Sequence, residues 1–204
     1  MNENHARLCS SSDWTGYIAN ELLPCLTRGV DLGAEMLEIG PGPGAATEWL
    51  RRRVGKLTAV EVDERAALAL ARRYEGTNVE VVVADAANLI FPDCSFDSVG
   101  CFTMLHHVPT SESQSKLLAG AFRVLRPGGV FIGSDSLASD ALRDFHGGDT
   151  YNPIAPPCLL GRLLALGFSC VSMVVDDDLR FIARKPSETG RSMNVVDGTQ
   201  VTQC

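Results

Sequence analysis

The sequence lacks any apolar run long enough to cross a membrane. The stretch Val79–Ala84 is interrupted by Glu80 and falls far short of the ~18 residues that a spanning helix needs. The N-terminus, Met1–His5, has no basic segment followed by an apolar one, which is the pattern of a secretory signal. We therefore expect a soluble, cytoplasmic protein with no stable membrane insertion.

The sequence also lacks cysteine and histidine patterns that hold metals or disulfides. Its seven cysteines are an odd number, and no two of them form a C-x-x-C pair, so neither a disulfide framework nor a zinc site is indicated. The four histidines include one adjacent pair but no H-x-x-x-H spacing. We predict free thiols, as in a reducing compartment, and no metal.

Positive charge is scarce. The chain has 18 basic and 25 acidic residues, a formal charge of −7, whereas nucleic-acid binders usually carry a basic face. The 204 residues suffice for about one domain, and a composition of 45% hydrophobic and 21% charged residues is ordinary for a globular fold. We expect one globular domain and no nucleic-acid partner.

Apolar spacing predicts strands and helices that alternate along the chain. A helix is expected over Asp13–Leu26, with Ser12 or Asp13 as its N-cap. An Arg-Pro-Gly-Gly segment, 126–129, should end a later helix. Such alternation is typical of a mostly parallel sheet covered by helices. Strands are expected at 35–39, 57–62, 79–84, 98–102 and 130–133, and helices at 45–54, 64–75, 111–125 and 158–166.

The C-terminal part breaks this rhythm. Residues 136–157 contain three prolines and are expected to form a loop or substrate lid. Strands at 169–175 and 179–184 are separated by three aspartates, a join short enough for a hairpin, so one of them should be antiparallel. The globular domain is expected to span 13–185, between a flexible start (1–12) and a polar, disordered tail (186–204).

A glycine turn and two acids lie at the ends of the first three predicted strands. Strand 35–39 leads into the turn Gly40-Pro-Gly-Pro-Gly44, whose spacing is neither G-x-G-x-x-G nor that of a P-loop. Glu61 lies 21 residues after Gly40, where such folds place an acid that binds ribose hydroxyls. Asp85 comes after the third strand. Because ligands bind beyond the carboxyl ends of the strands, the three features together indicate a pocket for an adenosine-like cofactor.

The sequence resembles the class I S-adenosylmethionine-dependent methyltransferases, of the type 11 small-molecule kind, over about residues 13–185. That family implies a three-layer αβα Rossmann-like sandwich. Its sheet would have seven strands, mostly parallel, with the last one antiparallel. The stretches that carry the resemblance are LEIGPGPGAAT (37–47), TAVEVD (58–63), VVVADAANLIFPDCSFDSV (81–99), MLHHV (104–108), FRVLRPGGVFI (122–132) and LLALGF (163–168).

The resemblance also implies a cofactor, S-adenosyl-L-methionine, and roles at matching positions. The methionine end would be held by Glu38 and the glycine turn, and closed by backbone near the end of the fourth strand. Acids after the second and third strands would bind the ribose and the adenine edge. The residues so implied are Glu38, Gly40, Pro41, Gly42, Gly44, Glu61, Val62, Asp85, Ala86, Phe102 and Thr103.

Histidines lie where the methyl group is expected. His106 and His107 come after the fourth strand, and either could act as a general base because imidazole titrates near neutrality. Packing or loop-orienting roles are the alternative. His146 is a second candidate base. Candidates to line the acceptor pocket are Trp14, Tyr17, His146 and Tyr151.

Motifs that are absent after the fourth strand narrow the class of acceptor. Amino-directed DNA methyltransferases carry Asp, Asn or Ser followed by Pro-Pro and an aromatic residue after the fourth strand, whereas this chain has Phe102-Thr-Met-Leu105. No cluster of acids and Asn of the metal-dependent catechol kind comes after that strand either. A small-molecule acceptor is therefore predicted, and a lipid or quinone stays an alternative if the lid opens.

Two other functions stay open. One is binding of S-adenosylmethionine or S-adenosylhomocysteine without catalysis. A nicotinamide-dependent oxidoreductase is the second alternative, although the G-x-G-x-G turn, the position of Asp85 and the lack of a Tyr-x-x-x-Lys pair speak against it. The methylated atom, the use of a base and the oligomeric state are not determined by the sequence.

Overall fold

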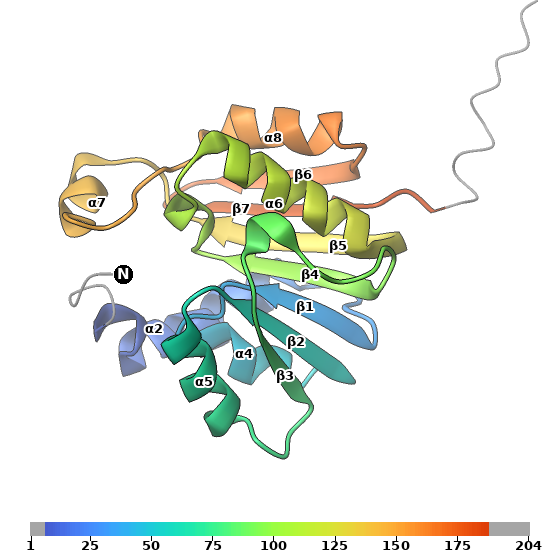
Figure 1. Cartoon of the computed structure of the whole chain (residues 1–204). Helices are drawn as coiled ribbons and strands as arrows, with labels where there is room; N and C mark the ends of the chain where they lie inside the picture. Colours follow the sequence, from blue (N-terminus) through green and yellow to red (C-terminus); the bar gives the residue numbers. More distant parts are fainter. Residues whose placement is uncertain (1–6, 188–204) are drawn as a thin grey trace, which may run out of the picture.

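The computed structural model describes residues 7–187, which form a seven-stranded sheet between two layers of helices (Figure 1). The strand order is β3-β2-β1-β4-β5-β7-β6. The chain runs outward from β1 to β3 and then returns to β4, so the order reverses between β1 and β4, where α/β sheets bind ligands. The strands are β1 Glu35–Ile39, β2 Lys56–Glu61, β3 Val79–Val83, β4 Phe96–Phe102, β5 Leu125–Asp135, β6 Ser169–Val175 and β7 Leu179–Arg184.

Helices cover both faces of the sheet. The segments α2, η1 and α3, with α4, pack on one face, while α6 and α8 pack on the other. The helical segments are α2 Ser12–Tyr17, the π-helical turn η1 Ile18–Leu22, α3 Leu23–Leu26, α4 Ala45–Leu50, α5 Glu64–Arg73, η2 Ala86–Asn88, η3 Leu105–His107, α6 Ser111–Val124, α7 Asp140–Phe145 and α8 Pro156–Ala165. This confirms the predicted αβα sandwich.

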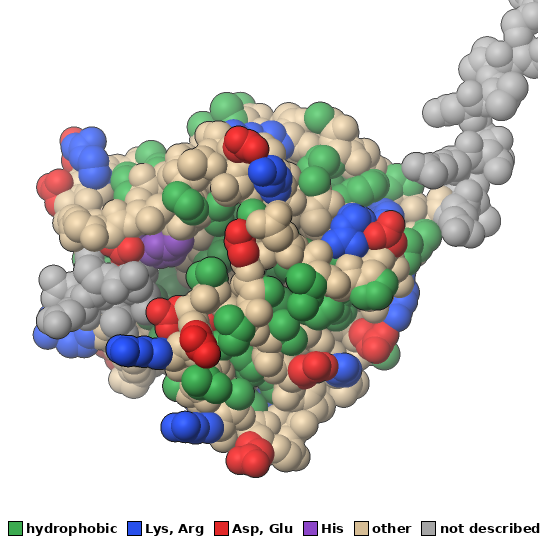
Figure 2. Space-filling view, viewed as in Figure 1, with side chains coloured by type: hydrophobic (Ala, Val, Ile, Leu, Met, Phe, Trp, Pro, Cys, Tyr) green, Lys and Arg blue, Asp and Glu red, His purple; other side chains and the backbone are tan. Residues whose placement is uncertain are grey.

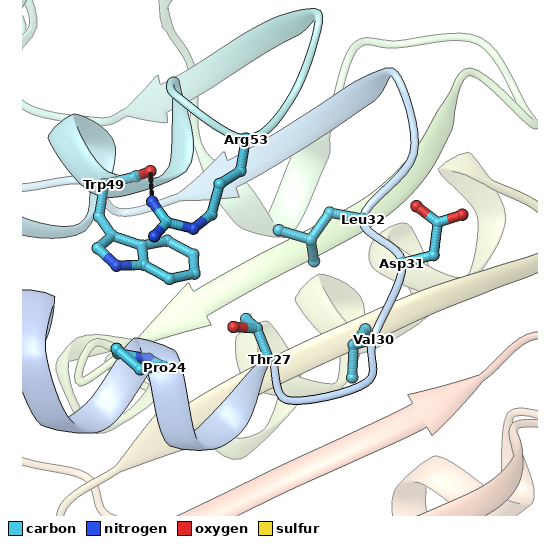
Figure 3. Close-up of a pocket in the computed structure, with 7 residues that line it drawn as sticks. All are labelled: Pro24, Thr27, Val30, Asp31, Leu32, Trp49 and Arg53. Atoms are coloured by element: carbon cyan, nitrogen blue, oxygen red, sulfur yellow. Dashed lines mark hydrogen bonds between the residues drawn. The ribbon is translucent and has the colours of Figure 1, made fainter.

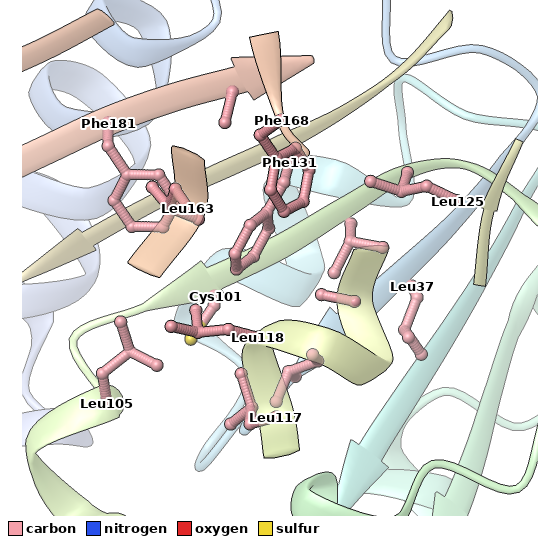
Figure 4. Packing of buried hydrophobic residues seen from close by; sticks show 14 of the residues in the cluster. Leu37, Cys101, Leu105, Leu117, Leu118, Leu125, Phe131, Leu163, Phe168 and Phe181 are labelled. Atoms are coloured by element: carbon pink, nitrogen blue, oxygen red, sulfur yellow. The ribbon is translucent and has the colours of Figure 1, made fainter. Parts of the chain in front are cut away.

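Alternation along the central strands fills both layers. In β5, Phe131 joins the core under α6 and α8, whereas Val130 and Ile132 join the core under the N-terminal helices. The ring of Phe131 lies 5.0 Å from that of Phe181 and 5.8 Å from that of Phe168 (Figure 4). Both faces of the central strands are thus buried, which explains why these strands are apolar runs.

The N-terminal helix differs from the prediction at its start and its middle. Its N-cap is Ser11, whose hydroxyl accepts from the Trp14 amide at 3.2 Å, rather than Ser12 or Asp13. The helix also changes to a π-helical turn before Pro24. Proline lacks the amide that would continue an α-helical ladder, so a widened turn precedes it.

The passage from α6 into β5 is also a correction. The segment 126–129 ends the helix as predicted, but it is already part of β5. Phe96 pairs with Leu125 and Ser98 pairs with Val130, so β5 advances by five residues where β4 advances by two. This bulge absorbs Pro127 and two glycines, and it makes β5 longer than the predicted 130–133.

The C-terminal third confirms the predicted hairpin and shows a helix within the predicted loop or lid, residues 136–157. Strand β7 is antiparallel to both β5 and β6. The predicted loop 136–157 contains a helix, α7, capped by the Ser139 hydroxyl. In Figure 1, α7 and α2 lie at the end of the sheet toward which β5 points. Most of the two segments predicted to be flexible, 1–12 and 186–204, lies outside the described residues. Within 7–187, no helix is long and apolar enough to span a bilayer.

Candidate functional site

The glycine turn after β1 is shaped by left-handed backbone. Gly40, Gly42 and Gly44 have φ of +67°, +52° and +89°, which side chains rarely tolerate. A Cβ at Gly40 would come within 2.8 Å of the Met104 side chain, whereas a Cβ at Gly42 would meet no atom within 4 Å. The turn therefore packs against the segment after β4 at its start and leaves open space at Gly42.

Glu38 lies at the end of β1 and is buried. One carboxylate oxygen accepts a hydrogen bond from the Thr47 hydroxyl at 2.7 Å. Burial raises the pKa of Glu38 to about 7, the Thr47 bond opposes this, and the neighbouring Glu61 adds to it. A buried acid with few donors is suited to a cationic group, because a positive charge would offset its desolvation.

Glu61 ends β2 and connects that strand to the glycine turn. Its carboxylate accepts from the amide of Gly42 at 3.3 Å and from the amide of Asp63 at 3.0 Å. The next residue, Val62, is 69% exposed. A ribose needs a hydrogen-bond acceptor and the face of a base needs an apolar surface, and the roles of Glu61 and Val62 toward them stay predictions.

Asp85 and Thr103 mark the ends of β3 and β4. Asp85 caps the η2 turn, accepting from the Ala87 amide at 2.8 Å and from the Asn88 side chain at 3.0 Å, and Ala86 is the first residue of that turn. Thr103 comes directly after Phe102 and has φ of +50°. A β-branched residue in this region is strained, and such strain concentrates at functional sites.

The predicted cofactor residues thus lie after four neighbouring strands at one edge of the sheet. Asp85 has a local structural task as an N-cap, so its purine contact stays a prediction. The remaining cofactor assignments also stay predictions.

On the other side of the switch point lies a histidine–carboxylate pair. Nδ1 of His106 lies 2.5 Å from Oδ1 of Asp135, and both residues are buried. Oδ2 of Asp135 and the hydroxyl of Ser134 are also buried without a hydrogen-bond partner among the described residues. Sequence reasoning missed Asp135 because it ended the fifth strand at residue 133. An acid at the end of a buried strand was the available signal.

His107 and His146 complete what we call the three-histidine group (His106, His107, His146). The rings of His106 and His107 are 4.2 Å apart, and that of His146 is 5.0 and 5.1 Å from them. Tyr151 stacks on His146 at 5.2 Å. Figure 2 shows the imidazole surface (purple) in a hollow at the left edge of the molecule. The structure therefore brings the predicted candidates His106, His107, His146 and Tyr151 together.

The segment 136–157, which we call the lid after its predicted role, is held against the turn after β4 by hydrogen bonds of Gln114 and Asn152. The Gln114 side chain, 1% exposed, donates to the carbonyls of Leu105 at 3.1 Å and Asn152 at 2.7 Å. The Asn152 amide donates to the His106 carbonyl at 2.7 Å, and its side chain donates to that of Val108 at 3.0 Å. These bonds hold His146 and Tyr151 beside His106. Sequence reasoning missed Gln114 and Asn152 because their partners are distant backbone carbonyls.

Trp14 and Tyr17 are not part of this group of contacts. Their rings are 5.7 Å apart and pack at the edge of the core under the N-terminal helices. The Tyr17 hydroxyl donates to Asp178 at 3.0 Å, and burial together with this bond raises the pKa of Tyr17 to about 12. The contact ties α2 to the β6–β7 turn. A role of either residue toward an acceptor stays a prediction.

Two open cavities are lined by none of the predicted site residues. One has a volume of about 430 Å³, and the guanidinium of Arg53 lies 3.3 Å above the ring of Trp49 at its wall. It is lined by Pro24, Thr27, Val30, Asp31, Leu32, Trp49 and Arg53 (Figure 3). The other, of about 510 Å³, lies between the N-terminal segment and Phe145 of α7. It is therefore an opening beside the lid.

Comparison with known proteins agrees with this geometry. Residues 37–133 match the family model described as a methyltransferase domain. The chain is 43% identical over 58 residues to a probable ribosomal RNA small subunit methyltransferase A of Thermococcus onnurineus, covering 28% of this chain and 21% of that protein. It is 34% identical over 102 residues to a ubiquinone biosynthesis O-methyltransferase of Pseudomonas fluorescens, covering 48% and 42%. The chain thus spans less than half the length of these relatives.

The fold is also found in solved structures. A SAM-dependent methyltransferase from Methanosarcina mazei superimposes with a TM-score of 0.65 at 21% identity, covering 81% of this chain and 98% of that one. At this identity the likeness concerns the fold.

Proposed function

Because this chain carries the methyltransferase domain of the class I S-adenosylmethionine-dependent family, we propose that it transfers a methyl group to a small-molecule acceptor. The observation that carries the proposal is the arrangement at the carboxyl edge of the sheet. A glycine turn and two acids lie on one side of the switch point, and a histidine–carboxylate pair under a fastened lid lies on the other.

The residues after β1 and β2 fit the cofactor. Open space at Gly42 allows close approach of a ligand to the backbone. Buried Glu38 suits the ammonium end of the methionine moiety, and Glu61 is placed to accept from ribose hydroxyls. S-adenosylmethionine supplies an electrophilic methyl group on a sulfonium. The protein adds alignment of the acceptor with that group, which requires fixed geometry rather than strong acid–base chemistry.

The residues after β4 and β5 fit the acceptor side. Asp135 fixes the ring of His106, and the lid holds His146 and Tyr151 beside it. Figure 2 shows histidine surface (purple) in a hollow on the side of the molecule where α7 lies. An acceptor with a hydroxyl, carboxyl or thiol group of modest size suits such a polar, lid-covered space.

Ribosomal RNA is the competing acceptor, since one relative is named as an rRNA methyltransferase. The acidic balance of this chain, −7, disfavours a polyanion because no excess of cations offsets the phosphates. Catalytically inert cofactor binding is the other alternative. It predicts full affinity for S-adenosylhomocysteine without transfer to any acceptor.

The test is transfer of isotope-labelled methyl from S-adenosylmethionine to a panel of phenols, carboxylic acids, thiols and amines, with ribosomal RNA as a parallel arm. The wild-type chain should label at least one small molecule and no RNA. The Glu61→Gln variant should lose this labelling at low cofactor concentration and recover part of it at high concentration. Labelling of RNA alone, or cofactor binding without transfer, would contradict the proposal.

A further inference from the structure

The three-histidine group has the composition of a metal site. One ring nitrogen of each of His106, His107 and His146 lies within 4.8 Å of the other two. In a tetrahedral zinc site with Zn–N distances of about 2.0–2.1 Å, such nitrogens lie roughly 3.3 Å apart. A shift of roughly 1 Å in the rings would therefore close the group around an ion. The lid residue His146 comes from outside the segment that carries the other two, so sequence spacing gave no sign of it.

Hydrogen bonds on the far side of two rings set the tautomers that a metal needs. Nδ1 of His146 lies 2.7 Å from the carbonyl oxygen of Leu142. A carbonyl only accepts, so this Nδ1 carries the hydrogen and Nε2 presents a lone pair in the neutral ring. Nδ1 of His106 is held in the same way by the Asp135 carboxylate. Metal-binding histidines are oriented by such carbonyl and carboxylate partners.

From this geometry we propose that the three-histidine group binds one divalent transition-metal ion of the zinc class, with Asp135 as the positioning residue of His106. Three neutral imidazoles suit zinc, whereas magnesium and calcium prefer oxygen ligands. Among residues 7–187 the group offers three ligands, and a zinc ion held by three protein ligands keeps a fourth position open, as in catalytic rather than structural zinc sites.

The open position indicates the class of acceptor. His107 is half-buried, and Figure 2 shows histidine surface (purple) in a hollow of the molecule. A hydroxyl or carboxylate oxygen of the acceptor would bind the ion there and be oriented by it. This part rests on the proposed function, whereas the metal site does not.

The test is titration of the chelator-stripped full chain with Zn²⁺ by calorimetry, and with Co²⁺ by visible absorption. We expect one ion per chain and the intense visible bands of tetrahedral cobalt. The His107→Ala and His146→Ala variants should bind at least tenfold more weakly, and Asp135→Asn should bind roughly 10–100-fold more weakly. His107→Ala removes a half-buried ring, and its thermal unfolding is compared with that of the wild type. Asp135→Asn gives a second test if a histidine variant does not fold.

Two controls distinguish metal binding at the three-histidine group from metal binding by other side chains of the chain. The chain has one further histidine, His5, and His5→Ala should bind Zn²⁺ like the wild type. Alkylation of the exposed thiols Cys25, Cys94, Cys158 and Cys170 should also leave binding unchanged. Binding that survives the histidine variants, is lost on alkylation, or is absent altogether would overturn the metal site. Intact metal binding without methyl transfer would instead overturn the proposed function.

Discussion

The proposed cofactor side and the proposed acceptor side of the strand-end site are assembled in different ways. The cofactor side draws on Glu38, the glycine turn, Glu61 and Asp85, which lie at the ends of three successive strands. The acceptor side draws on η3, the end of β5 and a lid whose His146 and Tyr151 are distant in sequence from His106. The first is fixed by strand positions and backbone conformation. The second depends on hydrogen bonds between the lid and the turn after β4. Different substitutions should therefore disrupt the two sides.

The largest effect is expected in the glycine turn. Gly42→Val should abolish measurable binding of S-adenosylhomocysteine by calorimetry, because the side chain enters the open space of the turn. Gly76→Val is a matched control, since Gly76 also has a positive φ (+74°) and no atom within 4 Å of a Cβ. Both variants introduce backbone strain and should unfold at lower temperature, but the control should still bind. Equal binding by the two would place the cofactor elsewhere.

Removing the hydrogen bonds that hold the lid should lower the stability of the fold but leave its affinity for the cofactor nearly unchanged. Gln114→Ala leaves two carbonyls, on Leu105 and Asn152, without their buried donor. We expect a loss of about 2–3 kcal/mol in the free energy of unfolding, measured by urea titration. Affinity for S-adenosylhomocysteine should change less than twofold. A parallel loss of affinity would show that the two sides are coupled.

Removal of one charge tests the ribose assignment. Glu61→Gln should weaken S-adenosylhomocysteine binding by about 1–3 kcal/mol, because hydroxyl donors lose an ionised acceptor. Glu75→Gln, at an exposed acid beyond the end of α5, serves as the control and should leave affinity unchanged. If both variants bind like the wild type, Glu61 serves only to hold the turn and β2 together.

A smaller effect, in pH dependence, is expected at Glu38. Because its pKa in the fold is about 7 and that of an unfolded Glu is about 4.3, the folded chain holds a proton that the unfolded chain has released between these values. The free energy of unfolding should therefore fall as pH rises from 5 to 8. Glu38→Gln has no such proton, so its stability relative to the wild type should grow across this range by on the order of 1–2 kcal/mol. Urea unfolding at pH 5 and pH 8 measures this change. A difference in stability between variant and wild type that stays constant with pH would contradict the raised pKa of Glu38.

The same contrast explains how much could be predicted from the sequence. The strands, the hairpin and the acids at the ends of β1–β3 were predictable, because apolar periodicity locates a strand and the fold places ligand-binding residues at its carboxyl end. Helix α7 was missed because a short segment near several prolines is typical of a loop. Asp135 was missed because the prediction ended the fifth strand at residue 133, two residues before this buried acid. The contact of His146 with His106 was missed because no local pattern encodes the hydrogen bonds of residues 136–157.

The most direct measurement is a calorimetric titration of the full chain with S-adenosylhomocysteine, with NADH in a parallel cell. Glu61, the glycine turn and buried Glu38 predict one micromolar site for the first ligand and no heat of binding for the second. Binding of NADH alone would favour an oxidoreductase. Absence of both would mean that the turn and its acids serve the fold rather than a cofactor, and the proposed function would be wrong.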